Sequence, residues 1–473
     1  GRRAPISIKY MMPSCVPALP DEQAGAVITA ADMQAFFAEY PGDVFGLGEM
    51  MNLPGVFMAD PETCARIDAA NQTPSKQVDG HAPLVAGKDL NAYAAAGIIA
   101  DHESTIPEEA LDKLSRGMYV MLREGTCSHD LANLSPMLLE NPARARRCCF
   151  ATDDRAPSDA LSTGMIDNAC RVAIEAGIDP VVAISMASLS TAEAFGLDHG
   201  CRDPHELRGA IAPGKRADLL VLNDLTFATA PHRVCRRRLV AQDGTFVGEI
   251  APEMAEVAAL PMSCASVKLP KLSLDVFDYA FKPGEAVIDV VPGKAITGMA
   301  RPESAEGLRR IMLIERHGRG VSLQAEGADG DGPAGLGLVG KHIGRGWVRG
   351  FTITGGAIAS TIGHDSHNVC VVGDSAADMM AAVEAVGQGG HVLVRNGEVV
   401  ARIPLALGGL MSEGTAEDVA AQHDDFMVKA RAMGIEPPLD PIMGIIFLPL
   451  PVIPTLRIRP EGMFDVTTFT YAD

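Results

Sequence analysis

The chain has 473 residues, too many for one small domain, and its length predicts two or three domains. Apolar residues make up 47% and charged residues 21%, so packed cores are expected and wholesale disorder is not. With 40 lysines and arginines against 60 aspartates and glutamates, the formal charge is −20, which argues against a nucleic-acid partner.

The sequence also predicts a location. No uncharged apolar stretch reaches the roughly 18 residues of a membrane span, and no apolar signal region follows Gly1-Arg2-Arg3. The 10 cysteines form no C-x-x-C pair, which disfavours a disulfide framework or a zinc ribbon. We therefore expect a cytoplasmic protein with reduced cysteines and no membrane partner.

The first third of the chain alternates short apolar runs with helical patterns. The expected strands are Ile6–Met12, Val44–Met50, Gln77–Gly80, Gly97–Ala100, Met118–Leu122 and Cys148–Ala151. The expected helices are Ala31–Tyr40, Pro61–Ala70, Leu84–Ala95, Pro107–Ser115 and Ser128–Glu140. This alternation predicts an α/β fold with a parallel sheet. Six strands fit an open sheet, whereas a (β/α)8 barrel would need two more before residue 1.

The rest of the chain changes character twice. Helices are expected at Met165–Ala176 and Pro180–Phe195, followed by a turn and strand within 209–222 and a hairpin of Val234–Ala241 with Thr245–Glu249. Beyond Leu269, strands are expected at Ala286–Val291, Arg310–Glu315, Gly350–Ile353, Val369–Val372, His391–Arg395 and Glu398–Arg402, and helices at Asp374–Ala385 and Glu417–Met433. Asp243-Gly244 and Asn396-Gly397 are typical of tight hairpin turns.

Polar side chains stand where four of the early apolar runs stop. Glu49, His81, His102 and Asp153 each follow or end such a run. In a parallel barrel the carboxyl ends of the strands converge on one face, where active sites lie. Any one of these residues could be a polar cap bonded into its loop, but four at strand ends form a metal-ligand set of imidazoles and carboxylates.

Such a set suffices for metal-assisted hydrolysis. A metal lowers the pKa of a bound water, and the resulting hydroxide attacks an electrophilic carbon. A carboxylate, most naturally Asp153, takes the proton and delivers it to the leaving group. These residues alone leave the substrate open.

The sequence resembles the bacterial adenine deaminase family of the amidohydrolase superfamily. The matching segments, in order along nearly the whole chain, are Met12–Ala18, Gly46–Asn52, Pro54-Gly55, Asp79–Pro83, Asp101–Glu103, Arg123–Gly125, Thr152–Arg155, Gly209–Gly214, Ala217-Asp218, Gly356–Thr361, His364–Asn368, Gly409–Ser412 and Val452–Pro454. Gly-Glu-Met-Met-Asn, Asp-Gly-His-Ala-Pro and His-Asp-Ser-His-Asn are together highly specific.

The resemblance implies a (β/α)8 amidohydrolase-type barrel with its first strands missing. Residues 1–200 would hold barrel strands three to eight, 201–265 part of a small β-sandwich, and 266–473 a C-terminal α+β domain. It also implies two divalent metals (Mn, Fe or Zn), with Glu49 as the bridge, His81 and His102 as ligands of one metal, and Asp153 as ligand of the other and proton shuttle. The implied reaction is attack of metal-bound hydroxide on C6 of adenine, giving hypoxanthine and ammonia, a step of purine salvage.

One family feature is absent from this sequence. Members carry His-x-His on the first barrel strand, and no His precedes His81 here. If nothing precedes Gly1, we expect one metal position to be impaired and the chain to be inactive or insoluble.

Further site residues follow from motif positions. His364, Asp365, Ser366 and His367 either form a turn held by local hydrogen bonds or fold over the barrel mouth to bind the purine, and we favour the second. Glu103 and Arg123 are also candidates for substrate binding or for orienting the metal ligands, and Asp154 for relaying protons.

Two other functions stay open. The chain could be another cyclic amide or amidine hydrolase of the superfamily, or an inactive truncated purine-binding relative. The ligands do not select among Zn, Fe and Mn. A homo-oligomer is expected, as for most soluble enzymes of this kind.

Overall fold

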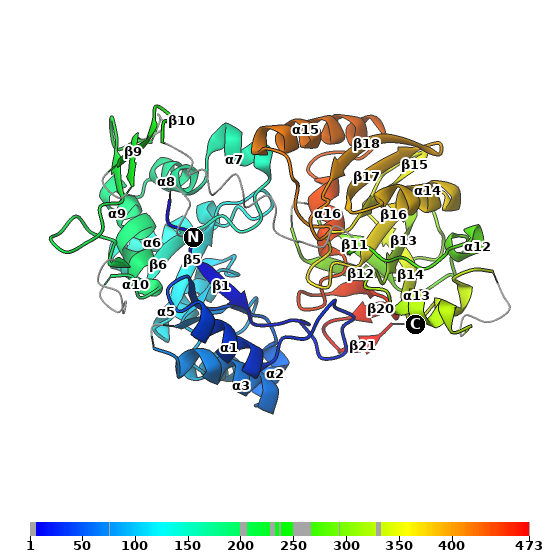
Figure 1. The fold of residues 1–473 in the computed structure, drawn as a ribbon, viewed down its shortest axis with the longest axis horizontal. Helices are drawn as coiled ribbons and strands as arrows, with labels where there is room; N and C mark the ends of the chain where they lie inside the picture. Colours follow the sequence, from blue (N-terminus) through cyan, green and yellow to red (C-terminus); the bar gives the residue numbers. More distant parts are fainter. Residues whose placement is uncertain are drawn as a thin grey trace. The chain divides into compact units, whose positions relative to one another are not determined.

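The computed structural model describes residues 6–74, 76–198, 206–227, 232–235, 238–248, 266–292, 294–327 and 333–472. The chain divides into two compact units (Figure 1). Unit 1 consists of Gly1–Cys15, Ile28–Arg155 and Thr163–Leu260, and unit 2 of Val16–Val27, Ala156–Ser162 and Pro261–Asp473. Among the described residues, no helix combines the length and the apolar character that crossing a membrane requires.

Unit 1 begins with alternating strands and helices. Its strands are β1 (Tyr10–Pro13), β2 (Val44–Met50), β3 (Gln77–Gly80), β4 (Ala100–Asp101), β5 (Tyr119–Arg123) and β6 (Cys148–Ala151). Its helices in this part are α1 (Ala30–Glu39), α2 (Leu53–Phe57), α3 (Pro61–Asn71), α4 (Gly87–Ala95), α5 (Pro107–Ser115), α6 (Leu131–Glu140) and the 3₁₀ turn η1 (Pro142–Arg147). Local signals set several of these boundaries. Thr29 and Asp32 form a capping box at the start of α1, and Asp60 caps α3 just before Pro61.

The six strands run parallel and in sequence order. One sheet has the order β1-β2-β3 and a second β4-β5-β6, and a parallel bridge between Val78 and Ile98 links β3 to the segment that leads into β4. Leu47, Val78 and Val120 at the strand centres have no exposed surface. Strands buried on both faces are typical of parallel sheets covered by helices.

A large part of the unit 1 core lies behind β5 and β6. There, α5, α6 and α8 (Ile166–Glu175) pack side chains against both strands, among them Leu134, Leu138 and Ala169. The helical stretch that follows is α9 (Pro180–Ser185), a π-helical turn η2 (Met186–Ser190) and α10 (Thr191–Ala194). A small antiparallel sheet has the order β10-β9-β8-β7, with β7 (Leu219–Val221), β8 (His232–Cys235), β9 (Arg238–Gln242) and β10 (Thr245–Phe246).

Unit 2 is built on an eight-stranded sheet of order β12-β11-β14-β13-β16-β15-β17-β18, antiparallel except between β11 and β14. These strands are β11 (Val287–Val290), β12 (Thr297–Ala300), β13 (Leu308–Ile314), β14 (Ile343–Arg349), β15 (Gly356–Ser360), β16 (Val369–Gly373), β17 (Gly390–Arg395) and β18 (Glu398–Pro404). A further sheet holds β19 (Leu456–Arg459), β20 (Gly462–Asp465) and β21 (Thr470–Tyr471). The helices are α7 (Pro157–Thr163), α12 (Leu274–Phe277), α13 (Arg319–Ala325), η5 (Leu336–Leu338), α14 (Ala376–Val386), α15 (Ala416–Ala432) and α16 (Pro441–Phe447).

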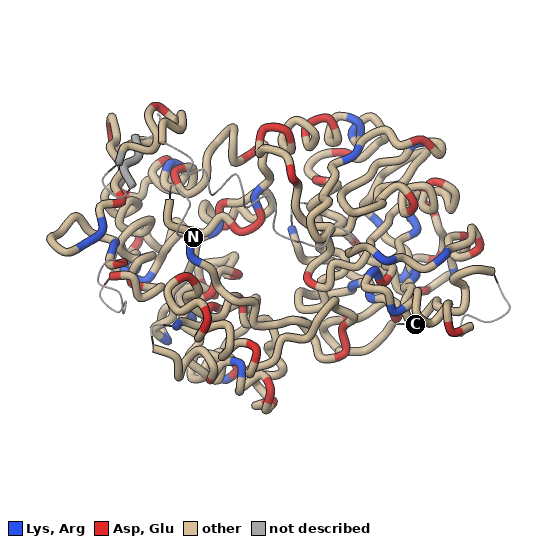
Figure 2. Tube along the Cα trace, viewed as in Figure 1, with Lys and Arg blue, Asp and Glu red and all other residues tan. Residues whose placement is uncertain are grey.

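The unit 2 sheet packs its apolar face against α14. Met379, Ala382 and Val383 of this helix are buried against side chains of β13, β15 and β16. Within each unit, acidic and basic residues are interspersed along the chain (Figure 2). The predicted α/β fold, with parallel strands first and a separate, mostly antiparallel sheet later, is confirmed.

Within the described part of the chain, most expected elements lie within a few residues of their predicted bounds, and three differ in kind; Glu249, the expected end of the last hairpin strand, lies outside the described residues. Gly350–Ile353 is not a strand, because the pairing of β14 with β13 ends at Arg349. Val234–Ala241 spans two antiparallel strands, β8 and β9, rather than one. The helix expected over Pro180–Phe195 is interrupted by η2.

Candidate metal and active site

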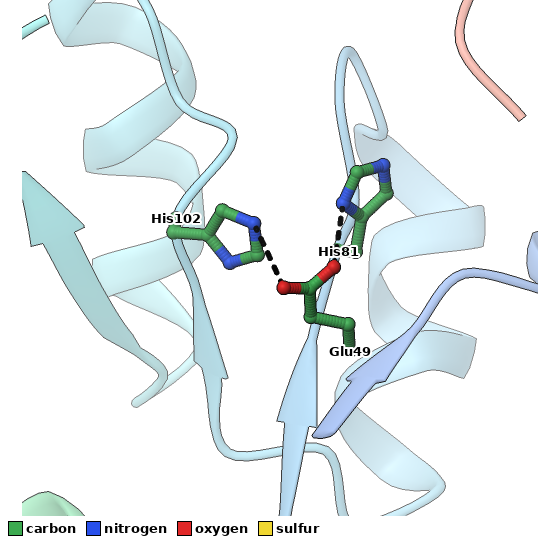
Figure 3. Close-up of side chains that lie close together, drawn as sticks. All are labelled: Glu49, His81 and His102. Atoms are coloured by element: carbon green, nitrogen blue, oxygen red, sulfur yellow. Dashed lines mark ion pairs between the residues drawn. The ribbon is translucent and has the colours of Figure 1, made fainter. Parts of the chain in front are cut away.

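Three metal-type side chains meet at one edge of the parallel strands. Glu49 is the penultimate residue of β2, His81 follows β3 and His102 follows β4, and the Glu49 carboxylate lies between the two imidazoles (Figure 3). Glu49 Oε2 is 3.8 Å from His81 Nδ1, and Glu49 Oε1 is 4.0 Å from His102 Nε2. One ligand atom from each residue lies within 4.8 Å of the others, a spacing that fits a shared cation.

The histidine environments favour metal binding over a purely structural role. His81 and His102 are buried, at 4% and 7% exposure, and both ring nitrogens of His81 lack a hydrogen-bond partner among the described residues. Buried polar atoms almost always have a partner. An imidazole buried with both nitrogens unsatisfied therefore fits a residue whose partner is a metal ion.

A second group adjoins the first. His102, Glu103 and Asp153 also bring one ligand atom each within 4.8 Å of one another. Glu103 Oε1 lies 3.4 Å from His102 Nε2 and 3.6 Å from His81 Nδ1. His102 thus belongs to both groups, and the four residues predicted as ligands are divided between them, with Glu103 added.

Two of the carboxylates sit on strained backbone. Glu49 has φ of 39° and Asp153 has φ of 53°, both in the left-handed region that glycine favours. Such conformations cost on the order of 1–3 kcal/mol and cluster at functional sites. Neither positive φ is predictable from the residue pattern, because both positions hold acidic residues and not glycine.

Arg123 holds the carboxylates of this edge. Its Nη1 donates to Glu103 Oε1 at 2.5 Å and to Asp153 Oδ2 at 2.9 Å, and its Nε donates to Asp130 Oδ2 at 2.8 Å. Asp153 Oδ1 also accepts from the backbone N of Asp154 at 2.8 Å. The Asp153 carboxylate is therefore fixed at both oxygens while a quarter of its side chain stays exposed.

Neighbouring charges and hydrogen bonds shift the pKa values of Glu103 and His102 more strongly than burial does. Burial would raise the pKa of Glu103, but His81, His102 and Arg123 hold it well below its usual range. Burial would lower the pKa of His102, but the hydrogen bond to Glu103 and the charge of Glu49 raise it well above 6.5. Burial, with smaller contributions from the charges of Glu49 and Asp101, raises the pKa of Asp79, two residues before His81, to about 6. The protein thus concentrates negative charge where the imidazole nitrogens face one another.

A buried ion-pair network, not anticipated from the sequence, supports the two histidine loops. Lys113 of α5 has no exposed surface and donates to Asp101 Oδ2 at 2.7 Å, Glu109 Oε1 at 2.9 Å and the backbone O of Ala82 at 2.8 Å. Asp101, equally buried, accepts from the backbone N of Ala82 and of Glu103. The sequence pattern singled out Asp101 as part of the Asp101-His-Glu103 segment. It did not single out Lys113, because a lysine four residues after a glutamate is typical of an exposed ion pair on a helix.

The comparisons with known proteins identify the family of this chain. Residues 2–247 match the amidohydrolase family, and residues 339–470 match the adenine deaminase C-terminal domain. The adenine deaminase of Nitratidesulfovibrio vulgaris (strain Hildenborough) is 39% identical over 99% of this chain and 78% of its own. The chain belongs to the adenine deaminase family of the amidohydrolases.

Other similarities differ greatly in strength. The adenine deaminase of Desulfatibacillum aliphaticivorans is 40% identical over 99% of this chain and 78% of its own length. Among solved structures, a beta-aspartyl dipeptidase from Fervidobacterium islandicum AW-1 has a TM-score of 0.35 and 14% identity, covering 46% of this chain and 63% of that one. Amidohydrolase membership implies a divalent metal, and the unsatisfied imidazole and adjoining carboxylates fit one.

The second predicted group of site residues lies in unit 2 and is partnered there. Ser366 Oγ donates to buried Glu22, and the backbone O of Ser366 lies 2.8 Å from His317 Nε2. The His364 ring stacks on Phe447 with centroids 5.1 Å apart, and its Nδ1 lies 3.1 Å from Asp365 Oδ1. The expected contact of His364–His367 with the substrate stays a prediction.

Proposed function

We propose that the chain hydrolyses adenine to hypoxanthine and ammonia. The observation that carries the proposal is the meeting of Glu49, His81 and His102 at the strand ends of a chain in the adenine deaminase family. Relatives named adenine deaminase align with nearly the whole length of this chain. Purine salvage in the cytoplasm, by a homo-oligomer, is the setting proposed for this activity.

The metal site is proposed from the same residues. Glu49, His81 and His102 would hold one divalent cation, and Asp153 a second, with Mn, Fe or Zn as candidates. When bound, such a cation acts as a Lewis acid and lowers the pKa of water toward neutrality. That one of the two metal positions is impaired if nothing precedes Gly1 stays a prediction.

The chain's own carboxylates carry the proton steps in this proposal. Hydrolysis adds the oxygen of one water to C6 of adenine and breaks the bond to the exocyclic nitrogen, which leaves as ammonia. Asp153 accepts a proton from the water and passes it to the departing nitrogen. Arg123 and the backbone N of Asp154 hold the Asp153 oxygens in place, and Asp154 assists proton relay.

The purine would be bound by groups that can pair with its ring nitrogens. We assign this role to Glu103 and Arg123 of unit 1 and to His364, Asp365, Ser366 and His367 of unit 2. The division into a barrel (1–200), a partial β-sandwich (201–265) and a C-terminal domain (266–473) is part of the same proposal.

The test is ammonia release by the purified chain from adenine, adenosine, guanine and cytosine. We expect adenine to be the preferred substrate and Glu49→Gln to lower its turnover at least 100-fold. Glu62→Gln is the matched control, because the two glutamates have nearly equal side-chain exposure, 48% and 49%, and the Glu62 carboxylate pairs with Arg66 and the backbone N of Ala30, away from the histidines.

Three outcomes would contradict the proposal. Release from guanine or cytosine but not adenine would indicate another hydrolase of the superfamily. No release from any substrate, with no metal bound, would indicate an inactive purine-binding relative. Equal activity of Glu49→Gln and Glu62→Gln would remove Glu49 from the site.

A further inference from the structure

A tyrosine hydroxyl bridges two of the proposed ligand strands from behind. Tyr93 lies on α4 and has no exposed surface. Its hydroxyl donates to the backbone O of Met50 at 2.7 Å and accepts from the backbone N of His81 at 2.9 Å. Met50 directly follows Glu49, so this single oxygen joins the chain at one ligand to the chain at the next.

The local structure is built to admit this hydroxyl. A Cβ on Gly80 would lie 3.0 Å from Tyr93 Oη and would also meet the backbone O of Ala100, so residue 80 must be glycine for both approaches. The glycine between Asp79 and His81 is therefore explained by the close approach of Tyr93 and Ala100. Glycine lets α4 and β4 close on the strand end that presents His81.

The Tyr93 hydroxyl forms its two hydrogen bonds next to the place where the regular pairing between β2 and β3 is interrupted. The β2–β3 register is regular from Gly46 to Leu47 and then shifts before Met50 pairs with Gly80. Glu49 lies inside that irregular stretch, with its positive φ. The Tyr93 hydroxyl bonds to both sides just beyond the irregularity and fixes how far Met50 can move from His81.

We propose that Tyr93 is a positioning residue for the metal site, holding Glu49 and His81 at the separation a shared cation requires. The inference rests on the proposed function, because it assumes that these two residues bind a metal. Tyr93 touches neither metal nor substrate in this proposal. It acts only through the backbone next to each ligand, as groups that orient ligands commonly do.

The test compares Tyr93→Phe with Tyr279→Phe. Tyr279 in unit 2 is the matched control, because its hydroxyl also donates to backbone oxygens, those of Ile311 at 2.8 Å and Gly346 at 3.0 Å. The full chain, stripped with a chelator, is titrated with Mn²⁺ to obtain Kd. Amide hydrogen exchange at His81 is followed by mass spectrometry as a second measurement.

We expect Tyr93→Phe to raise the Mn²⁺ Kd roughly 10-fold and to speed exchange at His81, and Tyr279→Phe to change Kd less than twofold. A wild-type Kd in Tyr93→Phe, or an equal rise in both variants, would overturn the inference and leave the proposed function intact. Absence of Mn²⁺, Fe²⁺ and Zn²⁺ binding by the wild-type chain would overturn the metal site, and the inference with it.

Discussion

Replacing Lys113 by methionine is expected to destabilise unit 1 by about 3–5 kcal/mol. The Lys113 ammonium has three protons and four acceptors within reach, namely Asp101, Glu109, Ser104 and the backbone O of Ala82. Methionine fills a similar volume but leaves the Asp101 carboxylate, with 0% exposure, without its cation. Removing one partner of a buried pair costs this much because the other charge stays buried.

The matched control is Lys429→Met on α15. Lys429 also pairs with a carboxylate four residues earlier, Asp425, at 2.6 Å, but the two side chains are 42% and 54% exposed. Exposed pairs of this kind contribute about 0.3–0.5 kcal/mol. The two variants thus make the same chemical change and differ in burial.

The assay is urea unfolding followed by two signals. Far-UV circular dichroism reports on both units, whereas the fluorescence of Trp347, the only tryptophan, reports on unit 2. We expect Lys113→Met to move the circular dichroism midpoint strongly and Lys429→Met hardly at all. Midpoints are compared because a chain of two units need not unfold in one step. A shift for Lys113→Met no larger than for Lys429→Met would refute the reasoning.

Three further predictions concern other buried groups. Burial raises the pKa of Glu22 from 4.5 to about 7, so the protonated form favours the fold and stability should fall by up to about 3 kcal/mol as pH rises from 4.5 to 7. Glu22→Gln should remove this loss in urea titrations at pH 5 and 8, and a wild-type slope in the variant would contradict it. Arg123→Met should lower the free energy of unfolding by about 3 kcal/mol, because it leaves the buried Glu103 carboxylate without its cation. Arg349→Met, at an exposed pair with Asp289, should lower it by less than about 1 kcal/mol, and equal unfolding midpoints for the two variants would contradict this prediction. Burial raises the pKa of the Cys15 thiol, so iodoacetamide should label it at least 10-fold more slowly than partly exposed Cys64, as peptide mass spectrometry would show; equal rates would be unexpected.

The elements that the sequence predicted well are those with local causes. β2, β3 and β6 have the predicted bounds, and for β6 the cause is a continuous apolar run, Cys148–Ala151, that stops at Thr152. Both predicted hairpin turns are present. Asn396 and Gly397 both have positive φ, as do Asp243 and Gly244, which matches the turn that such pairs favour.

Elements whose causes lie far away in the chain were missed. β14 contains Gly344 and Gly346, which weaken any strand prediction, yet residue 344 must be glycine because the backbone O of Arg459 lies against it, and the side chain of Met463 packs against Gly346. Nothing near these glycines in sequence reveals that contact. The interruption of the 180–195 helix by a π-helical turn is likewise invisible in the residue pattern.

For the candidate site, the sequence by itself determined which residues stand at strand ends and to which family they belong. Only the tertiary structure decided that Glu49, His81 and His102 meet within 4.8 Å, that Glu103 joins His102 and Asp153, and that His81 is buried unsatisfied. Strand ends follow from local hydrophobic pattern, but distances between them depend on sheet pairing and on groups packed behind. Lys113 and Tyr93 are such groups, since their burial comes from helices folding onto strands distant in sequence.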